Sequence, residues 1–218
     1  MSRRAPRSPV SAARTVVGAD RAARALLVQL PGAHADFWSA WARVLLRALL
    51  EMAALSGGPG RRGSMVFVDE WVMGLLDGDL ARPGRVLARF GVADSIADVR
   101  VAELVADAAR WFGAFDQAVT RWGDRRCTRA VAVVVDRAVA SFRHPPLGIT
   151  CGEWFAARWH AADRSDRDEA SLWELVAVER DGRSPQSQHG CRATGVGGGE
   201  LATGAATERG GVAVVAGM

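Results

Sequence analysis

The longest regular pattern of apolar positions in the chain lies between residues 37 and 55. Apolar side chains recur there every three or four residues, at Phe37, Trp38, Trp41, Val44, Leu45, Ala48, Leu49, Met52 and Leu55. This spacing places them on one face of a helix. Arg43, Arg47 and Glu51 fall between them at four-residue intervals, so we expect these three on the opposite, polar face. The pattern predicts an amphipathic helix.

Shorter helical patterns flank this one. On the N-terminal side, Asp20 is a candidate cap for a helix through Leu30, although the run 26–28 would also suit a strand. On the C-terminal side, the acidic pair Asp69 and Glu70 is typical of a helix start. A short helix over 84–90 and a capping box formed by Ser95 and Asp98 are expected next.

A second pass of the same order follows from residue 121. An apolar helix over 127–142 is interrupted by His144-Pro145-Pro146. Glu153-Trp154 then stands where Glu70-Trp71 stands in the first pass, each after a long apolar helix and a Pro/Gly loop. This order indicates an internal duplication. The predicted fold is all-α, with two pseudo-symmetric four-helix repeats packed as one domain.

Composition sets the expected limits of that domain. The chain has 218 residues, 49% of them hydrophobic and 24% charged, the balance of an ordinary globular protein. We expect a flexible basic arm over 1–20, a helical domain over 21–182 and a disordered Gly-rich tail over 183–218. Within the domain, the repeats are expected at about 37–110 and 115–180.

The cysteine content and the hydropathy of the sequence indicate the cellular compartment in which we expect the protein. Cys127, Cys151 and Cys191 are odd in number and widely spaced, which favours free thiols and a reducing compartment. The basic N-terminus is not followed by an apolar stretch of signal-peptide length, and arginines interrupt the most hydrophobic segment. The expected localisation is cytoplasmic, with no membrane partner.

The run Asp69-Glu70-Trp71-Val72-Met73-Gly74-Leu75-Leu76, followed by 86–92 and Val99-Arg100, resembles the Clp repeat. This is the N-terminal substrate-docking domain of the Clp unfoldase ATPases, where an acidic-His-Leu-Leu-Leu-Gly-Leu-Leu stretch precedes a small-residue helix ending in Leu-Gly-Val. Residues 129–145 are similar to the long helix and loop of the second repeat, but the acidic stretch after them is displaced by about two residues. Glu70 also stands where the family has His.

The resemblance implies a free-standing, non-catalytic module that binds a peptide or adaptor, with a Clp ATPase or its substrates as the partner. It places the family's acidic docking position on Asp69, Glu70 and Glu153, for basic or phosphoarginine-bearing polypeptide. A capping role at a helix N-terminus is the simpler explanation of the same carboxylates. No cofactor or metal is implied.

Catalytic motifs are missing from the sequence. A Walker A loop needs a lysine, and the chain has none; Ser64 does not stand in a Gly-x-Ser-x-Gly context. We therefore expect a protein that is not an enzyme.

The alternative function is a DNA-binding regulator, in which a helix pair over 85–90 and 95–109 acts as a helix-turn-helix. The net charge of +4 is a modest excess. Asp98, Glu103 and Asp107 would face the DNA backbone in that arrangement. Nucleic acid is thus the less favoured partner.

Overall fold

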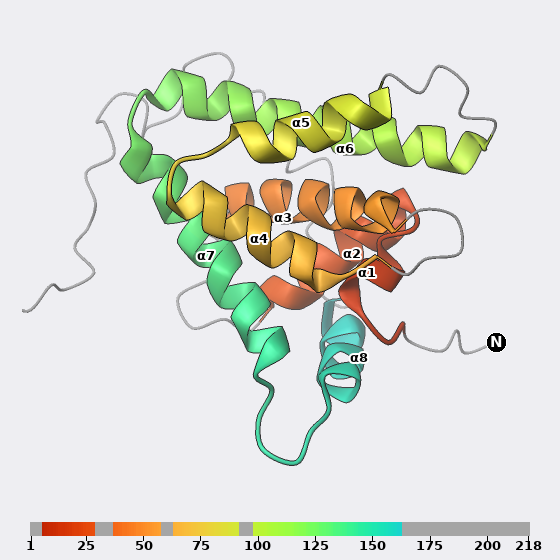
Figure 1. Cartoon of the computed structure of the whole chain (residues 1–218). Coiled ribbons are helices and arrows are strands. Elements are labelled where there is room, and N and C mark those ends of the chain that lie inside the picture. The colour runs from red at the N-terminus through yellow and green to blue at the C-terminus, as the bar shows by residue number, and fades with distance from the viewer. Residues whose placement is uncertain (1–5, 29–36, 58–62, 92–97, 163–218) are drawn as a thin grey trace, which may run out of the picture.

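The computed structural model describes residues 6–28, 37–57, 63–91 and 98–162 (Figure 1). These residues form eight helices and no strand: α1 (Pro9–Ala12), α2 (Val16–Leu27), α3 (Phe37–Ser56), α4 (Met65–Leu76), α5 (Ala81–Gly91), α6 (Val99–Trp122), α7 (Arg125–Arg143) and α8 (Cys151–Ala162). The prediction of an all-α fold is confirmed for the described part of the chain. The tail predicted over 183–218 lies outside it.

Helix α3 forms the centre of the molecule. Every residue from Trp41 to Ala53 is buried, because α2, α4, α6 and α7 all pack around it. A helix that is enclosed on all sides must bury its polar positions together with its apolar ones. The prediction that Arg43, Arg47 and Glu51 form a solvent-facing side is therefore wrong: all three are buried.

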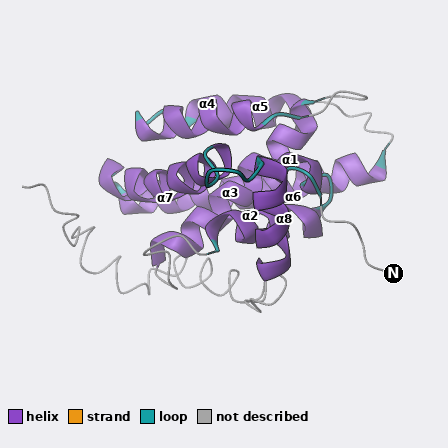
Figure 2. Ribbon diagram, turned by 90° about the horizontal axis from the view of Figure 1, so that it is seen from below, coloured by secondary structure: helices purple, strands orange, loops and turns teal. Residues whose placement is uncertain are grey.

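Helices α4 and α5 form a hairpin, since the chain reverses its direction between them (Figure 1), and they lie together along one side of the molecule (Figure 2). Helix α4 packs on α7 and α3, while α5 packs mainly on α6. The chain leaves α4 at Asp77 and turns at Gly78, whose φ of 85° is in the left-handed region that favours glycine. Asp79 then accepts a hydrogen bond from the backbone N–H of Ala81 at 2.9 Å, which starts α5.

The N-terminal segment is ordered further than the sequence indicated. Ser8 caps α1 and Thr15 caps α2, and Val10 and Ala19 are buried in the main core. The prediction of a flexible arm over 1–20 is thus wrong from Pro9 onward. Asp20 lies inside α2 and is buried, so the prediction that it caps this helix is also wrong.

Of two further predicted helix starts, one needs revision and the other is partly retained. Helix α4 begins at Met65 with Ser64 as its cap, which places Asp69 and Glu70 in its second turn rather than at its start. Asp98 caps α6 by accepting from the N–H of Arg100, while its predicted capping-box partner Ser95 lies outside the described residues.

The expected division into two repeats between residues 110 and 115 falls inside α6, which runs without interruption from Val99 to Trp122. The pseudo-symmetric arrangement of the two halves stays a prediction.

Candidate functional site

The carboxylates predicted to dock basic polypeptide on the first half of the chain are engaged by arginines. Asp69 lies 3.2 Å from the guanidinium of Arg143 in the last turn of α7. Partial burial raises the pKa of Asp69, and Arg143 opposes this shift. Glu70 pairs with Arg82 of α5 at 2.9 Å, and both side chains are about half exposed. A basic ligand would have to compete with these arginines.

Glu153 serves as a helix cap. Its Oε2 accepts hydrogen bonds from the backbone N–H of Thr150 at 3.0 Å and from the Thr150 hydroxyl at 2.7 Å, while that hydroxyl accepts from the N–H of Glu153. This reciprocal pair is a capping box at the start of α8. It lowers the pKa of Glu153. Since Asp69 and Glu70 are on α4, the three predicted carboxylates occupy two helices that lie in different layers (Figure 2).

A cluster of charged residues that the sequence pattern did not reveal lies in the core, where α2, α3 and α6 meet. Asp20 accepts from Nε and Nη2 of Arg43 at 3.0 and 2.7 Å. Asp107 accepts from Nε and Nη2 of Arg47 at 3.0 and 2.6 Å. Each carboxylate therefore neutralises one arginine of α3, from 23 and 60 residues away in the sequence.

Trp111 completes the environment of Arg47. Its indole N–H donates to Asp107 at 3.1 Å, and the Arg47 guanidinium carbon lies 4.6 Å from the centre of its ring. This geometry adds a cation–π contact to the ion pair. The cluster is closed from solvent, with Arg47 fully buried and Asp107 only 5% exposed. We assign it a structural role, joining three helices.

Glu51 is the unusual member of this buried cluster. It is fully buried, and neither of its carboxyl oxygens accepts a hydrogen bond from the described residues. Burial, with the neighbouring carboxylate of Asp107 as a second cause, raises the pKa of Glu51 to about 10. Arg47 Nε, 3.5 Å away, only partly offsets this. Glu51 is consequently protonated at neutral pH.

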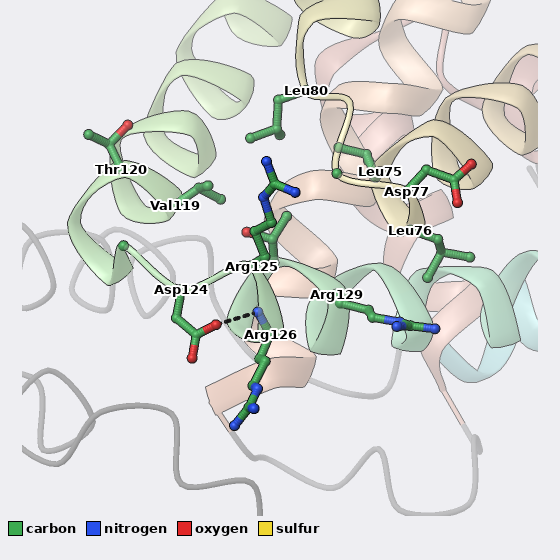
Figure 3. A pocket seen from close by; sticks show the side chains of 13 residues that line it. Leu75, Leu76, Asp77, Leu80, Val119, Thr120, Asp124, Arg125, Arg126 and Arg129 are labelled. Atoms are coloured by element: carbon green, nitrogen blue, oxygen red, sulfur yellow. Dashed lines mark hydrogen bonds between the residues drawn. The ribbon is translucent and has the colours of Figure 1, made fainter.

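The candidate ligand site is a pocket between the end of α4, the end of α6 and the start of α7 (Figure 3). Its volume is about 500 Å³. Its apolar wall is built from four aliphatic side chains of α4, the turn after it and α6: Leu75, Leu76, Leu80 and Val119. Its polar edge is the first two turns of α7. We call this cavity the α4–α7 pocket.

Three arginines line the polar edge of the α4–α7 pocket. Figure 3 shows Arg125 reaching up between Leu75 and Leu80, and Arg129 extending below Leu76. Arg126 follows Arg125 in the first turn, and all three are exposed. No carboxylate of the described residues forms an ion pair with any of them. Asp124 caps α7 by accepting a hydrogen bond from the backbone N–H of Arg126 at 2.8 Å, so its carboxylate is engaged by the helix backbone rather than by an arginine side chain.

The position of these arginines is unfavourable for folding. The N-terminus of a helix carries a partial positive charge, and a cation there destabilises the helix by about 0.3–1 kcal/mol. The three arginines in the first two turns of α7 therefore have no favourable interaction with the dipole of their own helix. Their charge is available to an anionic group bound beside the apolar wall.

Other chemistry receives little support from the described residues. Within them, no three His, Cys, Asp or Glu side chains are placed to hold a metal ion, and no helix is both long and apolar enough to cross a membrane. Cys151 has a free thiol, whereas Cys127 is disulfide-bonded. The expectation of three free thiols is thus wrong for Cys127, because sequence spacing does not show which cysteines meet in space.

Comparisons with known proteins return no match: none of the protein families, curated proteins or solved structures compared resembles this chain. The resemblance to the Clp repeat gains no support from them, and the site has to be interpreted from its own geometry.

Proposed function

We propose that this protein is a non-catalytic docking module that binds an acidic polypeptide segment in the α4–α7 pocket. The observation that supports this proposal most directly is the lining of the cavity. It combines an aliphatic wall with three arginines that form no ion pair in the described part of the chain. Such a site matches a ligand with a Leu, Ile or Val side chain next to an Asp or Glu. The carboxylate pairs with guanidinium, while the apolar side chain fills the cavity.

The charge of the proposed partner is opposite to the one implied by the Clp resemblance. The carboxylates Asp69, Glu70 and Glu153 have partners within the fold, whereas Arg125, Arg126 and Arg129 form no ion pair with any residue that the structure describes. Charged side chains without internal partners keep their full interaction energy for a ligand. An acidic segment is therefore the better complement of this surface.

The shape of the pocket also fits a peptide better than it fits duplex DNA. Duplex DNA is bound through rows of cations with an element that enters a groove, whereas the α4–α7 pocket pairs its arginines with an aliphatic recess. On α6, the second helix of the alternative helix-turn-helix, Asp98 and Glu103 are exposed and would face phosphates. These features favour the peptide over the DNA reading.

The test is fluorescence anisotropy with a labelled synthetic peptide in which Glu and Leu follow a helical pattern. Replacing Arg125, Arg126 and Arg129 by Ser should raise the dissociation constant about 10- to 100-fold, as the loss of charge-assisted hydrogen bonds predicts. The matched control replaces three other exposed arginines outside the pocket, Arg14, Arg100 and Arg137, by Ser. It removes the same net charge and should change the affinity only slightly.

Two results would contradict the proposal. Equal losses in both triple variants would show that the peptide responds to net charge alone. Tighter binding of duplex DNA than of the peptide, with a steep salt dependence, would support the regulator instead.

A further inference from the structure

A second arginine-edged cavity lies on the same helical hairpin as the α4–α7 pocket. It has a volume of about 630 Å³ and is formed by the end of α3, the first half of α4 and the length of α5. On its floor, Phe67 stacks on Trp71 with ring centres 6.0 Å apart and planes 20° apart. Val86 and Phe90 of α5 form the opposite wall. We call this cavity the α4–α5 groove.

The rim of the groove is basic. Arg82, Arg85 and Arg89 occupy α5 positions three and four residues apart, which share one helix face. Arg82 pairs with Glu70, whereas Arg85 and Arg89 form no ion pair among the described residues. Helix α5 itself contains no acidic residue. Two guanidinium groups are thus left for an anionic ligand above an aromatic floor.

The groove and the pocket follow one another along α4. The groove takes Phe67 to Trp71 from this helix, and the pocket takes Leu75 to Asp77. The two sets are centred about seven residues apart, which corresponds to about 10 Å at the helical rise of 1.5 Å per residue. The chain after α4 also contributes to both cavities: Leu80, in the turn before α5, lines the pocket, and Arg85 of α5 lines the groove.

We infer that the α4–α5 groove and the α4–α7 pocket are two halves of one binding surface for an acidic amphipathic helix whose apolar anchors are seven residues apart. The inference rests on the proposed function and specifies its ligand. One apolar anchor enters each cavity, and carboxylates beside the anchors meet Arg85 and Arg89 at one end and Arg125 at the other. Linking two anchors in one ligand makes the second contact intramolecular, which raises the affinity without any new contact.

The groove fits a peptide better than single-stranded nucleic acid. Bases bind by stacking on exposed aromatic faces, but Trp71 is only 3% exposed and its ring is covered by Phe67. An aliphatic or aromatic side chain of a peptide can instead enter the groove between α4 and α5.

The experiment compares three labelled peptides on the full-length chain by anisotropy. Each is acidic and helical, with two Leu anchors seven residues apart, two Leu anchors five residues apart, or a single Leu anchor. The seven-residue spacing should bind at least about 10-fold more tightly than the other two, because only this peptide reaches both cavities. Equal affinity for all three would overturn the inference.

Variants separate the inference from the function on which it rests. Replacing Arg85 and Arg89 by Ser should weaken the seven-residue peptide about 10-fold and leave the single-anchor peptide in the pocket almost unchanged. If this variant binds the seven-residue peptide like the wild type, while the Arg125, Arg126 and Arg129 triple variant loses it, the pocket stands and the two-part surface is refuted. Displacement of the peptide by a single-stranded oligonucleotide would also refute it.

Discussion

Replacing Glu51 by Gln should stabilise the protein at neutral pH. Glu51 is buried beside Asp107, and its pKa is raised from an ordinary 4.5 to about 10. Because the folded-state pKa lies above the unfolded one, the folded state binds the proton more tightly. The stability gained in this way is fully present below pH 4.5 and is lost progressively as the pH rises toward 10.

The magnitude follows from the distance between pH 7 and the unfolded-state pKa. Each pH unit above that pKa costs about 1.4 kcal/mol, since a proton must be taken up on folding. At pH 7 the wild type therefore loses about 3 kcal/mol relative to acid solution. Gln keeps the shape of the protonated acid and has no proton to lose in this pH range. The penalty disappears without a cavity.

The assay is urea denaturation of the wild type and the Glu51→Gln variant at pH 5, 6, 7 and 8, followed by tryptophan fluorescence. The difference in unfolding free energy should favour the variant by an amount that grows with pH, approaching about 1.4 kcal/mol per unit. The control is Glu103→Gln, which makes the same chemical change at an exposed site on α6. A difference that does not change with pH, or a variant less stable at pH 8, would refute the reasoning.

Three further substitutions test the packing by thermal or urea denaturation. Asp107→Ala removes the carboxylate that accepts two hydrogen bonds from the buried guanidinium of Arg47 and should cost about 3–5 kcal/mol; a loss below 1 kcal/mol would contradict the burial of this pair. Thr150→Ala removes one half of the capping box with Glu153 and should cost about 1 kcal/mol, and an unchanged midpoint would count against that cap. Gly63→Ala would place its new methyl group against a backbone carbonyl of α3, and we expect a loss of roughly 1–3 kcal/mol from the forced shift; normal stability would show that the loop before α4 can move aside.

The sequence by itself determined the fold class and the main helices. The apolar spacing over 37–55 identifies α3, and the pattern over 127–142 identifies most of α7, because a 3.6-residue period is a local property of the chain. The end of α7 could also be predicted from the local sequence, since His144 is followed by Pro145 and Pro146. Cap residues were harder to place: Asp98, predicted as the second member of a capping box begun by Ser95, is itself the cap of α6.

Helix surroundings could not be predicted in this way. Arg43, Arg47 and Glu51 have the spacing of a solvated face, and nothing nearby in the sequence contradicts that interpretation. Their burial depends on Asp20 and Asp107, which approach from two other helices. Only the packing of α2 and α6 around α3 decides that these charges lie in the core, because a buried charge is tolerated where a partner compensates it.

The candidate site was decided by the tertiary structure for the same reason. Arg125 and Arg129 look like ordinary helix-surface cations in the sequence, and Leu75 and Leu80 like parts of a core. One hint was local: a cluster of arginines directly after the capping residue Asp124 opposes the helix dipole. The pocket itself exists only because α4 and α6 end beside the start of α7, since an apolar wall and its charges can come together from distant parts of the chain only through packing.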